Sequence, residues 1–243
     1  MKTALIFGAS RGIGAAIAKE FAKNNYFVVI NYYKSEQSAL NLVDEIKSSN
    51  GHALAIKADI ANYEDVSNLV DSVKKIRPTI DVLVVSSGIA KNSLLIDATS
   101  SDIQNIISTN LIGTINACKK VSETMLSQHF GKIITISSMW GQVGASCETI
   151  YSASKGGIIA FTKALAKEIG YNNINVNCIA PGLIDTQMNC NLTDEDKKEL
   201  IEATPSFRIG TCQDIAKAAL WLASDDASYI NGHVLSINGG FIV

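Results

Sequence analysis

Short apolar runs alternate along the chain with longer stretches in which apolar residues recur every three or four positions. The short runs are typical of buried strands, and the longer spacing is typical of amphipathic helices. The expected strands are TALIF, FVVIN, ALAIK, IDVLVV, KIITIS, INVNCIA and HVLSIN. Because strands separated by helices pair in parallel and are buried on both faces, the pattern predicts a Rossmann-type, doubly wound α/β fold with a seven-stranded parallel sheet and helices on both faces.

The stretch 184–207 interrupts this alternation, because it is long and polar and follows a predicted strand. Its residues Thr193 to Asp196 are typical of the start of a short capped helix. A long excursion of this kind often forms a lid over a ligand, and the alternative is an ordinary surface helix. Since no linker or internal repeat divides the chain, we expect residues 1–243 to form a single domain with a lid at about 184–207.

Composition narrows the functional classes. Hydrophobic residues make up 47% and charged residues 18%, and the formal net charge is −2 without a basic block or an acidic tail. We therefore expect small-molecule chemistry, with no nucleic acid or membrane partner. The five cysteines are widely spaced without a CxxC pair, which favours reduced thiols over disulfides or a metal site. With no apolar signal segment at the N-terminus, we expect a cytoplasmic protein.

A glycine-rich turn, IFGASRGIG, follows the first predicted strand and opens the first helix. Gly8, Gly12 and Gly14 permit a tight turn and a close approach of the backbone to phosphate, and the helix N-terminus attracts negative charge. The turn, with Ser10 and Ile13, is thus expected to bind the phosphates of a dinucleotide. The alternative is that the glycines serve only the packing of strand against helix.

The end of the second predicted strand indicates which dinucleotide is bound. An NAD site usually places a carboxylate there for the ribose hydroxyls, whereas this chain continues Asn31-Tyr32-Tyr33-Lys34. Arg11 and Lys34 could instead bind a 2′-phosphate. The sequence therefore predicts NADP(H), and the alternative is that both basic side chains are simply solvated.

Candidate catalytic groups end the stretch SSMWGQVGASCETIYSASK. Tyr151 and Lys155 are four residues apart on a predicted helix that begins near Ile150, so they share a face. Ser137 and Ser138 end a strand at the carboxyl edge, where open α/β sheets bind ligands. The cation of Lys155 and an oxidised nicotinamide would lower the pKa of Tyr151, which would make the phenol a usable acid or base.

The segments GASRGIG, NLIG, YSASK, APGLIDT and INGGF, together with Ser138, stand in an order and spacing that resemble the short-chain dehydrogenase/reductase family. Within that family the chain is most similar to bacterial 3-oxoacyl-acyl-carrier-protein reductases of fatty acid biosynthesis. The resemblance implies NADPH-dependent reduction of a ketone to a secondary alcohol. In the implied tetrad, Tyr151 donates the proton, Ser138 hydrogen-bonds the carbonyl oxygen, Lys155 holds the nicotinamide ribose, and Asn110 positions a water.

Together, the turn and the resemblance give a set of expected site residues. The expected cofactor contacts are Gly8, Ser10, Arg11, Gly12, Ile13, Gly14, Lys34, Asp59, Ile60, Ser86, Ser87, Gly88, Tyr151, Lys155, Pro181, Gly182, Ile184 and Thr186. The middle of the catalytic stretch is expected to line the substrate path, and the substrate candidates are Trp140, Gln142 and Met188.

The chain departs from the family pattern near the cofactor. Phe7 stands where the family usually has threonine, and Val85-Ser86-Ser87 replaces an Asn-Asn-Ala stretch. Because the family's residues tie the first turn to the fourth strand, their joint loss suggests a coordinated repacking, with cofactor binding retained.

A second departure concerns the substrate. At positions that the resemblance implies for docking an acidic carrier protein, this chain has His129 and Asn172. The segment SSMWGQVGASCE also resembles reductases of the 5-aminopentanone group on elongation factor P, which is the alternative substrate. A non-catalytic dinucleotide sensor is another alternative, although the retention of Ser138, Tyr151 and Lys155 favours an enzyme.

Two predicted helices have broad apolar faces. In the segment GGIIAFTKALA, Lys163 is the only charge, and LIGTINACKKVSETML offers a second apolar face. Such faces must be covered by more than the sheet. With the resemblance, they predict a homotetramer, and the alternative is that the chain's own lid covers them.

Overall fold

The computed structural model describes residues 1–187 and 193–242, and every predicted strand is present. The strands are β1 (Thr3–Phe7), β2 (Phe27–Tyr32), β3 (His52–Lys57), β4 (Val82–Val85), β5 (Gly131–Ile136), β6 (Ile174–Pro181) and β7 (Val234–Ile237). The helices are α1 (Gly12–Lys23), α2 (Glu36–Ser48), α3 (Tyr63–Ile76), α4 (Ser100–Ile107), α5 (Gly113–Gln128), α6 (Trp140–Val143), α7 (Thr149–Ile169), α8 (Asp194–Glu202) and α9 (Cys212–Leu222). Short helical turns, among them η2 (Ser108–Ile112), connect several of these elements.

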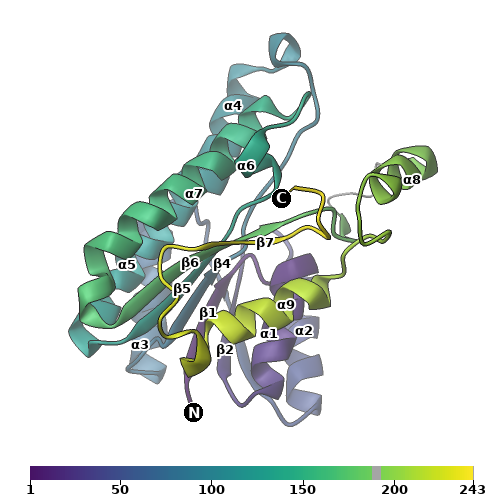
Figure 1. The fold of residues 1–243 in the computed structure, drawn as a ribbon. Helices are drawn as coiled ribbons and strands as arrows, with labels where there is room; N and C mark the ends of the chain where they lie inside the picture. Colours follow the sequence, from purple (N-terminus) through teal and green to yellow (C-terminus); the bar gives the residue numbers. More distant parts are fainter. Residues whose placement is uncertain (188–192, 243) are drawn as a thin grey trace.

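The strands form one parallel sheet in the order β3-β2-β1-β4-β5-β6-β7 (Figure 1). The chain builds outward from β1 in one direction as far as β3. It then returns to the other side of β1 and builds in the opposite direction from β4. The strand order therefore reverses between β1 and β4, and ligands of open α/β sheets bind in the crevice at the carboxyl ends beside such a reversal.

Alternation of side chains along the strands builds a core on each face of the sheet. In β1, Ala4 and Ile6 belong to the core that packs against α1, α2 and α9, whereas Leu5 and Phe7 belong to the core that packs against α3, α5 and α7. Figure 1 shows these two helix layers on opposite sides of the strands. The continuous burial of β1 explains why its sequence is an unbroken apolar run.

The predicted capped helix in the stretch 184–207 is present as α8. The side chain of Thr193 accepts a hydrogen bond from the backbone N–H of Asp196, whose carboxylate accepts one from the backbone N–H of Thr193. In Figure 1, α8 stands apart from the helices that cover the sheet. The substrate candidate Met188 lies outside the described residues. None of the helices in the described ranges combines the length and hydropathy that a bilayer crossing needs.

Candidate active site

Three of the predicted catalytic residues converge where β5 ends and α7 begins. Tyr151, Lys155 and Ser138 are 9%, 4% and 8% exposed. The Lys155 Nζ atom lies 5.6 Å from the centroid of the Tyr151 ring, and the hydroxyls of Ser138 and Tyr151 are hydrogen-bonded. The Ser138 Oγ atom also accepts a 3.2 Å bond from the backbone N–H of Trp140. The helical spacing and the strand end thus bring together a hydroxyl pair and an amine, as the sequence predicted.

Hydrogen bonds from β5 hold α7 in this position. The Ser137 hydroxyl donates to the Lys155 carbonyl at 2.8 Å, and the Lys155 amine donates to the Ile136 carbonyl at 2.9 Å. Ser137 therefore supports the geometry through the backbone of α7 and leaves the reacting groups to Ser138 and its partners.

Burial changes the proton affinities of the catalytic pair. It raises the pKa of Tyr151 to about 12; the hydrogen bond from Ser138 opposes this effect, and the charge of Glu148 adds to it. Burial also lowers the pKa of Lys155 to about 8. We predicted a lowered pKa for Tyr151 because Lys155 and a bound nicotinamide are positively charged. Burial of the phenol, which that prediction did not include, raises the pKa instead. The lowered pKa stays a prediction for the site with cofactor bound.

Asn110 lies in η2, a π-helical turn that connects α4 to α5. Its buried side chain donates to the Ile89 carbonyl at 2.9 Å and to the Ser154 hydroxyl at 3.0 Å, and it accepts from the Ile89 N–H at 2.8 Å. The widened turn leaves the Asn110 carbonyl to accept a 2.6 Å bond from the Thr114 hydroxyl. Asn110 thereby fixes the loop after β4 against α7, which the sequence pattern did not predict.

Gly88 brings this loop against the catalytic amine. A Cβ atom at Gly88 would lie 3.3 Å from the Lys155 Nζ atom and 3.5 Å from the Asn110 Oδ1 atom. The structure therefore assembles Asn110, Ser138, Tyr151 and Lys155 around one end of the sheet.

The glycine-rich turn has the form that a dinucleotide requires. Gly8 and Gly12 have positive φ angles of 72° and 56°. A Cβ atom on Gly8 would lie 2.6 Å from the Ser87 N atom, and one on Gly14 would lie 2.3 Å from the Gly8 carbonyl oxygen. A Cβ atom on Gly12 would lie 3.7 Å from Thr186. No acidic side chain occupies the first turn of α1, so a pyrophosphate fits at this helix N-terminus.

Asn31 is a supporting residue whose role the sequence analysis missed. It is buried at the end of β2, accepts a 3.4 Å bond from the Gly8 N–H, and donates a 3.0 Å bond to the Ala58 carbonyl. It therefore links the glycine-rich turn, where Ser10 and Ile13 are half-buried, to the end of β3. The available signal was a polar residue at the end of an otherwise apolar strand.

The expected adenine contacts follow β3. The Asp59 carboxylate accepts a 2.9 Å bond from the Ala61 N–H, and the Asp59 N–H donates to Asp65 at 3.0 Å. Ile60 is buried, and a Cβ atom on Gly113 would lie 2.8 Å from its side chain. Both residues are held rigidly at the carboxyl edge beside β2.

The two basic residues expected at a 2′-phosphate are exposed. The Arg11 guanidinium donates a 3.1 Å bond to the Gln187 side chain, and the Lys34 ammonium lies 5.8 Å from the centroid of the Tyr33 ring. Among the described residues, neither forms an ion pair within 4.0 Å. Their charges are therefore free of a competing carboxylate.

The departures from the family pattern near the first turn are accommodated by packing. Phe7 is fully buried in the core beneath α3, α5 and α7. The Ser86 N–H donates to the Phe7 carbonyl at 3.0 Å, and Ser87 lies directly against Gly8. Backbone contacts thus tie the first turn to the end of β4.

The segment at the end of β6 lies beside both the catalytic stretch and β7. The Pro181 carbonyl accepts a 2.9 Å bond from the Met139 N–H, and the Gly182 N–H donates to the Ile237 carbonyl at 2.9 Å. Ile184 is buried immediately after this turn. The segment is therefore placed at the same edge of the sheet as the catalytic groups.

The expected substrate residues of α6 differ in their surroundings. The Trp140 ring packs edge-on against Phe241, with 5.7 Å between ring centroids. Gln142 exchanges hydrogen bonds of 3.0 and 3.1 Å with Ser236 in β7. Gln142 is thus engaged in fixing α6 to β7, and Trp140 forms an aromatic wall with the C-terminal segment.

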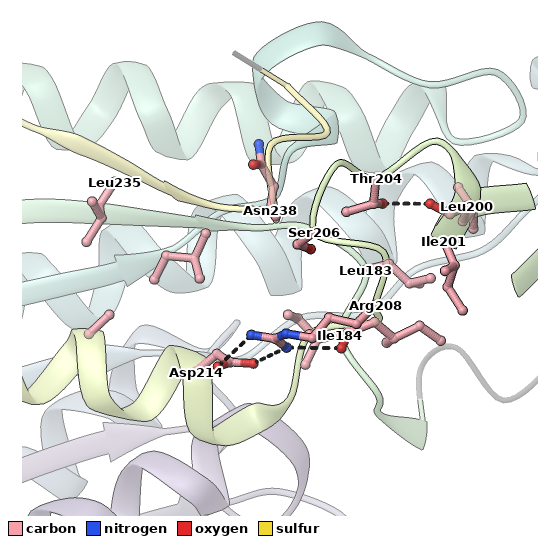
Figure 2. Close-up of a pocket in the computed structure, with 15 residues that line it drawn as sticks. Leu183, Ile184, Leu200, Ile201, Thr204, Ser206, Arg208, Asp214, Leu235 and Asn238 are labelled. Atoms are coloured by element: carbon pink, nitrogen blue, oxygen red, sulfur yellow. Dashed lines mark hydrogen bonds and ion pairs between the residues drawn. The ribbon is translucent and has the colours of Figure 1, made fainter. Parts of the chain in front are cut away.

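A separate cavity of about 320 Å³ lies beneath α8 (Figure 2). Leu200 and Ile201 of α8 line it, and an ion pair of 2.8 Å joins Arg208 to Asp214 at its side. No residue of the predicted catalytic tetrad is among its lining residues. The cavity therefore lies between α8 and the body of the molecule, apart from the reacting groups.

Comparisons with known proteins cover nearly the whole chain. A family model described as enoyl-(acyl carrier protein) reductase matches residues 8–242. A 3-oxoacyl-[acyl-carrier-protein] reductase from Staphylococcus epidermidis is 39% identical over 239 residues, which is 98% of each chain. Another from Chlamydia trachomatis is 43% identical over 242 residues, covering 98% of this chain and 96% of the relative.

A solved structure from Agrobacterium tumefaciens, assigned as a gluconate dehydrogenase, has the same fold. It superposes with a TM-score of 0.96 at 28% identity and covers 99% of this chain and 95% of its own.

Proposed function

Because the chain belongs to the short-chain dehydrogenase/reductase family, we propose that it reduces a ketone to a secondary alcohol with NADPH, in the manner of a 3-oxoacyl-[acyl-carrier-protein] reductase. The observation that carries this function is the convergence of Ser138, Tyr151 and Lys155 beside the glycine-rich turn. The family uses a nicotinamide dinucleotide, and the chain is an oxidoreductase acting on CH–OH and C=O groups.

The bound cofactor supplies the hydride, and the residues of this chain orient the carbonyl and supply the proton. The Ser138 hydroxyl hydrogen-bonds the carbonyl oxygen of the substrate. The raised pKa of Tyr151 keeps its phenol protonated at neutral pH, so that the phenol donates a proton to the same oxygen. The nearby Lys155 ammonium stabilises the phenolate that remains.

Three features support NADPH over NADH. No carboxylate lies in the stretch Asn31 to Lys34 at the end of β2, and the next one, Glu36, accepts a 3.0 Å bond from the Tyr32 hydroxyl. Arg11 and Lys34 lie near this end of β2 and near the phosphate turn. Neither cation is paired with a carboxylate among the described residues. Lastly, a guanidinium and an ammonium are suitable partners for a 2′-phosphate.

We further propose that the enzyme is a cytoplasmic homotetramer and that each copy is a single domain with a substrate lid at about 184–207. Alanines 153, 160 and 164 lie on the exposed side of α7, and Ile112 and Ile115 are partly exposed at the start of α5, which supports association through these helices. Among the described cysteines, Cys118, Cys147, Cys178 and Cys212 are free, as in a reducing compartment.

Oxidation of NADPH in the presence of an acetoacetyl thioester tests the proposal. We expect turnover with NADPH to exceed turnover with NADH, and Tyr151→Phe to lower kcat about 1,000-fold because the proton donor is lost. Binding of NADPH to this variant, measured by fluorescence, should persist. Undiminished turnover by Tyr151→Phe, or equal efficiency with NADH, would contradict the corresponding part of the proposal.

The physiological carrier of the ketone is tested by presenting it in different forms. The resemblance implies that an acidic carrier protein docks at the positions of His129 and Asn172. In this chain the two side chains are hydrogen-bonded to each other, with 2.7 Å between the His129 Nδ1 and Asn172 Oδ1 atoms. We therefore compare NADPH oxidation with three forms of the ketone: on acyl carrier protein, on coenzyme A, and as the 5-aminopentanone group of elongation factor P. The form with the highest kcat/KM identifies the carrier.

A further inference from the structure

The catalytic stretch from Ser137 to Lys155 contains two charged residues, Glu148 and Lys155. Lys155 is buried and donates to the Ile136 carbonyl, so its charge is directed into the site. Glu148 is half-buried immediately before α7, three residues before Tyr151. Positions three apart at the start of a helix lie on the same side, so Glu148 is the negative charge that this stretch places on the side of the catalytic phenol.

The Glu148 carboxylate has no hydrogen-bond or ion-pair partner in the part of the chain that the structure describes. Although the residue occupies the N-cap position of α7, its side chain accepts no helix N–H. Other polar side chains of the stretch are engaged: Gln142 bonds Ser236, and the Ser152 hydroxyl accepts from the Ala145 N–H. Glu148 is therefore available to a ligand.

The backbone holds Glu148 in a fixed place. Its carbonyl accepts a 2.8 Å bond from the Ser152 N–H, and its own N–H donates to the Ala145 carbonyl at 3.4 Å. The preceding carbonyl, that of Cys147, accepts a 2.8 Å bond from the Ser93 N–H. The backbone at Glu148 is thus anchored from α7, from its own loop and from the loop that follows β4.

Partial burial without a partner is unfavourable for a carboxylate. It raises the pKa of Glu148, and the negative charge of Glu148 in turn raises the pKa of the Tyr151 phenol. The second effect means that the charge is felt at the proton-donating group. A cation placed beside Glu148 would lower the pKa of both Glu148 and Tyr151.

The predicted lid is acidic in sequence, and the one lysine of the loop after β4 is already paired. The stretch 184–207 carries six carboxylates against two lysines. In the loop after β4, Lys91 is already paired with Asp102 at 2.7 Å. Because the Ser93 N–H of this loop bonds the Cys147 carbonyl, the loop runs beside Glu148, yet its lysine is already engaged with another carboxylate.

We propose that Glu148 is a specificity-determining residue that selects ketones carrying a cationic group, such as a primary ammonium, close to the carbonyl. The inference rests on the proposed ketone reduction and names its substrate class. The ammonium donates hydrogen bonds to the Glu148 carboxylate while the carbonyl oxygen accepts from Ser138 and Tyr151. By neutralising Glu148, the bound cation also makes the Tyr151 phenol a stronger acid, so that kcat increases and KM decreases.

A pair of ketones of equal length, one ending in a primary ammonium and the other in a hydroxyl, tests this role. We expect the wild-type enzyme to prefer the ammonium ketone by about 10-fold or more in kcat/KM, the usual range for a charge-assisted hydrogen bond. Glu148→Gln, which keeps the shape and removes the charge, should bring the ratio close to one, and Glu148→Asp should retain part of it. Glu168→Gln, an exposed carboxylate near the other end of α7, is the matched control and should leave the ratio unchanged.

The ratio separates this inference from the proposed function. A wild-type ratio near one, or a ratio that Glu148→Gln does not change, overturns the role of Glu148 even when both ketones are reduced. If neither ketone nor the acetoacetyl thioester supports NADPH oxidation, the ketone reduction itself is wrong and the inference fails with it. Circular dichroism of each variant checks that the fold is kept.

Discussion

Lys155 and Tyr151 are both buried, and burial moves their pKa values in opposite directions, to about 8 and about 12. At neutral pH the favoured state is therefore a neutral phenol beside an ammonium. This state suits reduction, because the phenol still holds the proton that it must donate. The single charge is stabilised by its hydrogen bond to the Ile136 carbonyl.

The lowered pKa of Lys155 has a consequence for stability. Its ordinary value is 10.5, so between about pH 8 and 10.5 the unfolded chain holds a proton that the folded chain has lost. Stability attributable to this residue therefore rises with pH across that window, by at most about 1.4 kcal/mol per pH unit. From pH 8 to 10, we expect the free energy of unfolding of the wild type to increase by about 2 kcal/mol relative to Lys155→Met, measured by urea denaturation.

Groups that titrate equally in the wild type and in Lys155→Met cancel when the free energies of unfolding of the two proteins are subtracted. The pKa of Tyr151 is raised above 10, so its own effect on stability falls above this window. Lys163→Met, which removes an exposed lysine from the same helix, provides the control. The difference in free energy of unfolding between the wild type and this variant should be the same at pH 8 and pH 10. If the difference between wild type and Lys155→Met is constant from pH 8 to 10, the pKa of Lys155 is not lowered.

At the scale of residues, the sequence predicts where the catalytic side chains lie better than it predicts how deeply they are buried. Tyr151, Lys155 and Ser138 could be placed together because helical spacing and a strand end define their geometry. The burial that sets their pKa values depends on packing by distant segments. For the same reason the roles of Asn31 and Glu148 were missed, since a side chain's partners, or its lack of them, cannot be deduced from its neighbours in the chain.

At the scale of elements, the glycines of the first turn look alike in sequence but differ in what they require. Gly12 has a positive φ angle and open space around it, since the nearest atom, in the side chain of Thr186, is 3.7 Å from a Cβ position. Gly14 is helical, yet a Cβ atom there would lie 2.3 Å from the Gly8 carbonyl oxygen. The first is needed for conformation, and the second is needed for the close approach of α1 to β1.

Gly14→Ala should therefore destabilise the protein by about 2–3 kcal/mol and weaken NADPH binding, because the turn must open to admit the methyl group. Gly144→Ala is the matched comparison, since Gly144 has a φ angle of 78° but no atom within 4 Å of a Cβ position. With ψ at 163°, this substitution should cost about 1–3 kcal/mol of backbone strain and leave NADPH binding unchanged. Thermal unfolding and NADPH titration measure both effects, and equal losses of NADPH affinity in the two variants would refute the steric argument.

The elements themselves were predictable where periodicity is strong. The strands and the start of α7 agree with the sequence to within one or two residues because buried strands and amphipathic helices leave clear patterns. The π-helical turn η2 and the short helix α6 were not predicted. Both depend on contacts from elsewhere in the chain, such as the bonds of Asn110 to Ile89 and Ser154 and the bond of Gln142 to Ser236.

At the scale of the whole molecule, the alternation of strands and helices was enough to predict the layers. Each parallel crossover must place a helix over one face of the sheet, and the apolar runs required both faces to be covered. Surfaces that face other copies leave a weaker signal. In α7 the exposed positions include alanines 153, 160 and 164, which are small enough to lie flat against a partner helix.

Ala160→Arg tests whether α7 is an assembly surface. The side chain is exposed in one copy, so the substitution should leave the fold intact, whereas in a helix-to-helix contact between copies a large cation has no room. We expect light scattering to show a tetramer for the wild type and smaller species for this variant. Ser38→Arg, at an exposed position of α2 on the other face of the sheet, makes the same change of charge and should remain tetrameric. A monomeric wild type, or a variant that keeps the wild-type mass, would instead favour the alternative that the chain covers this face itself.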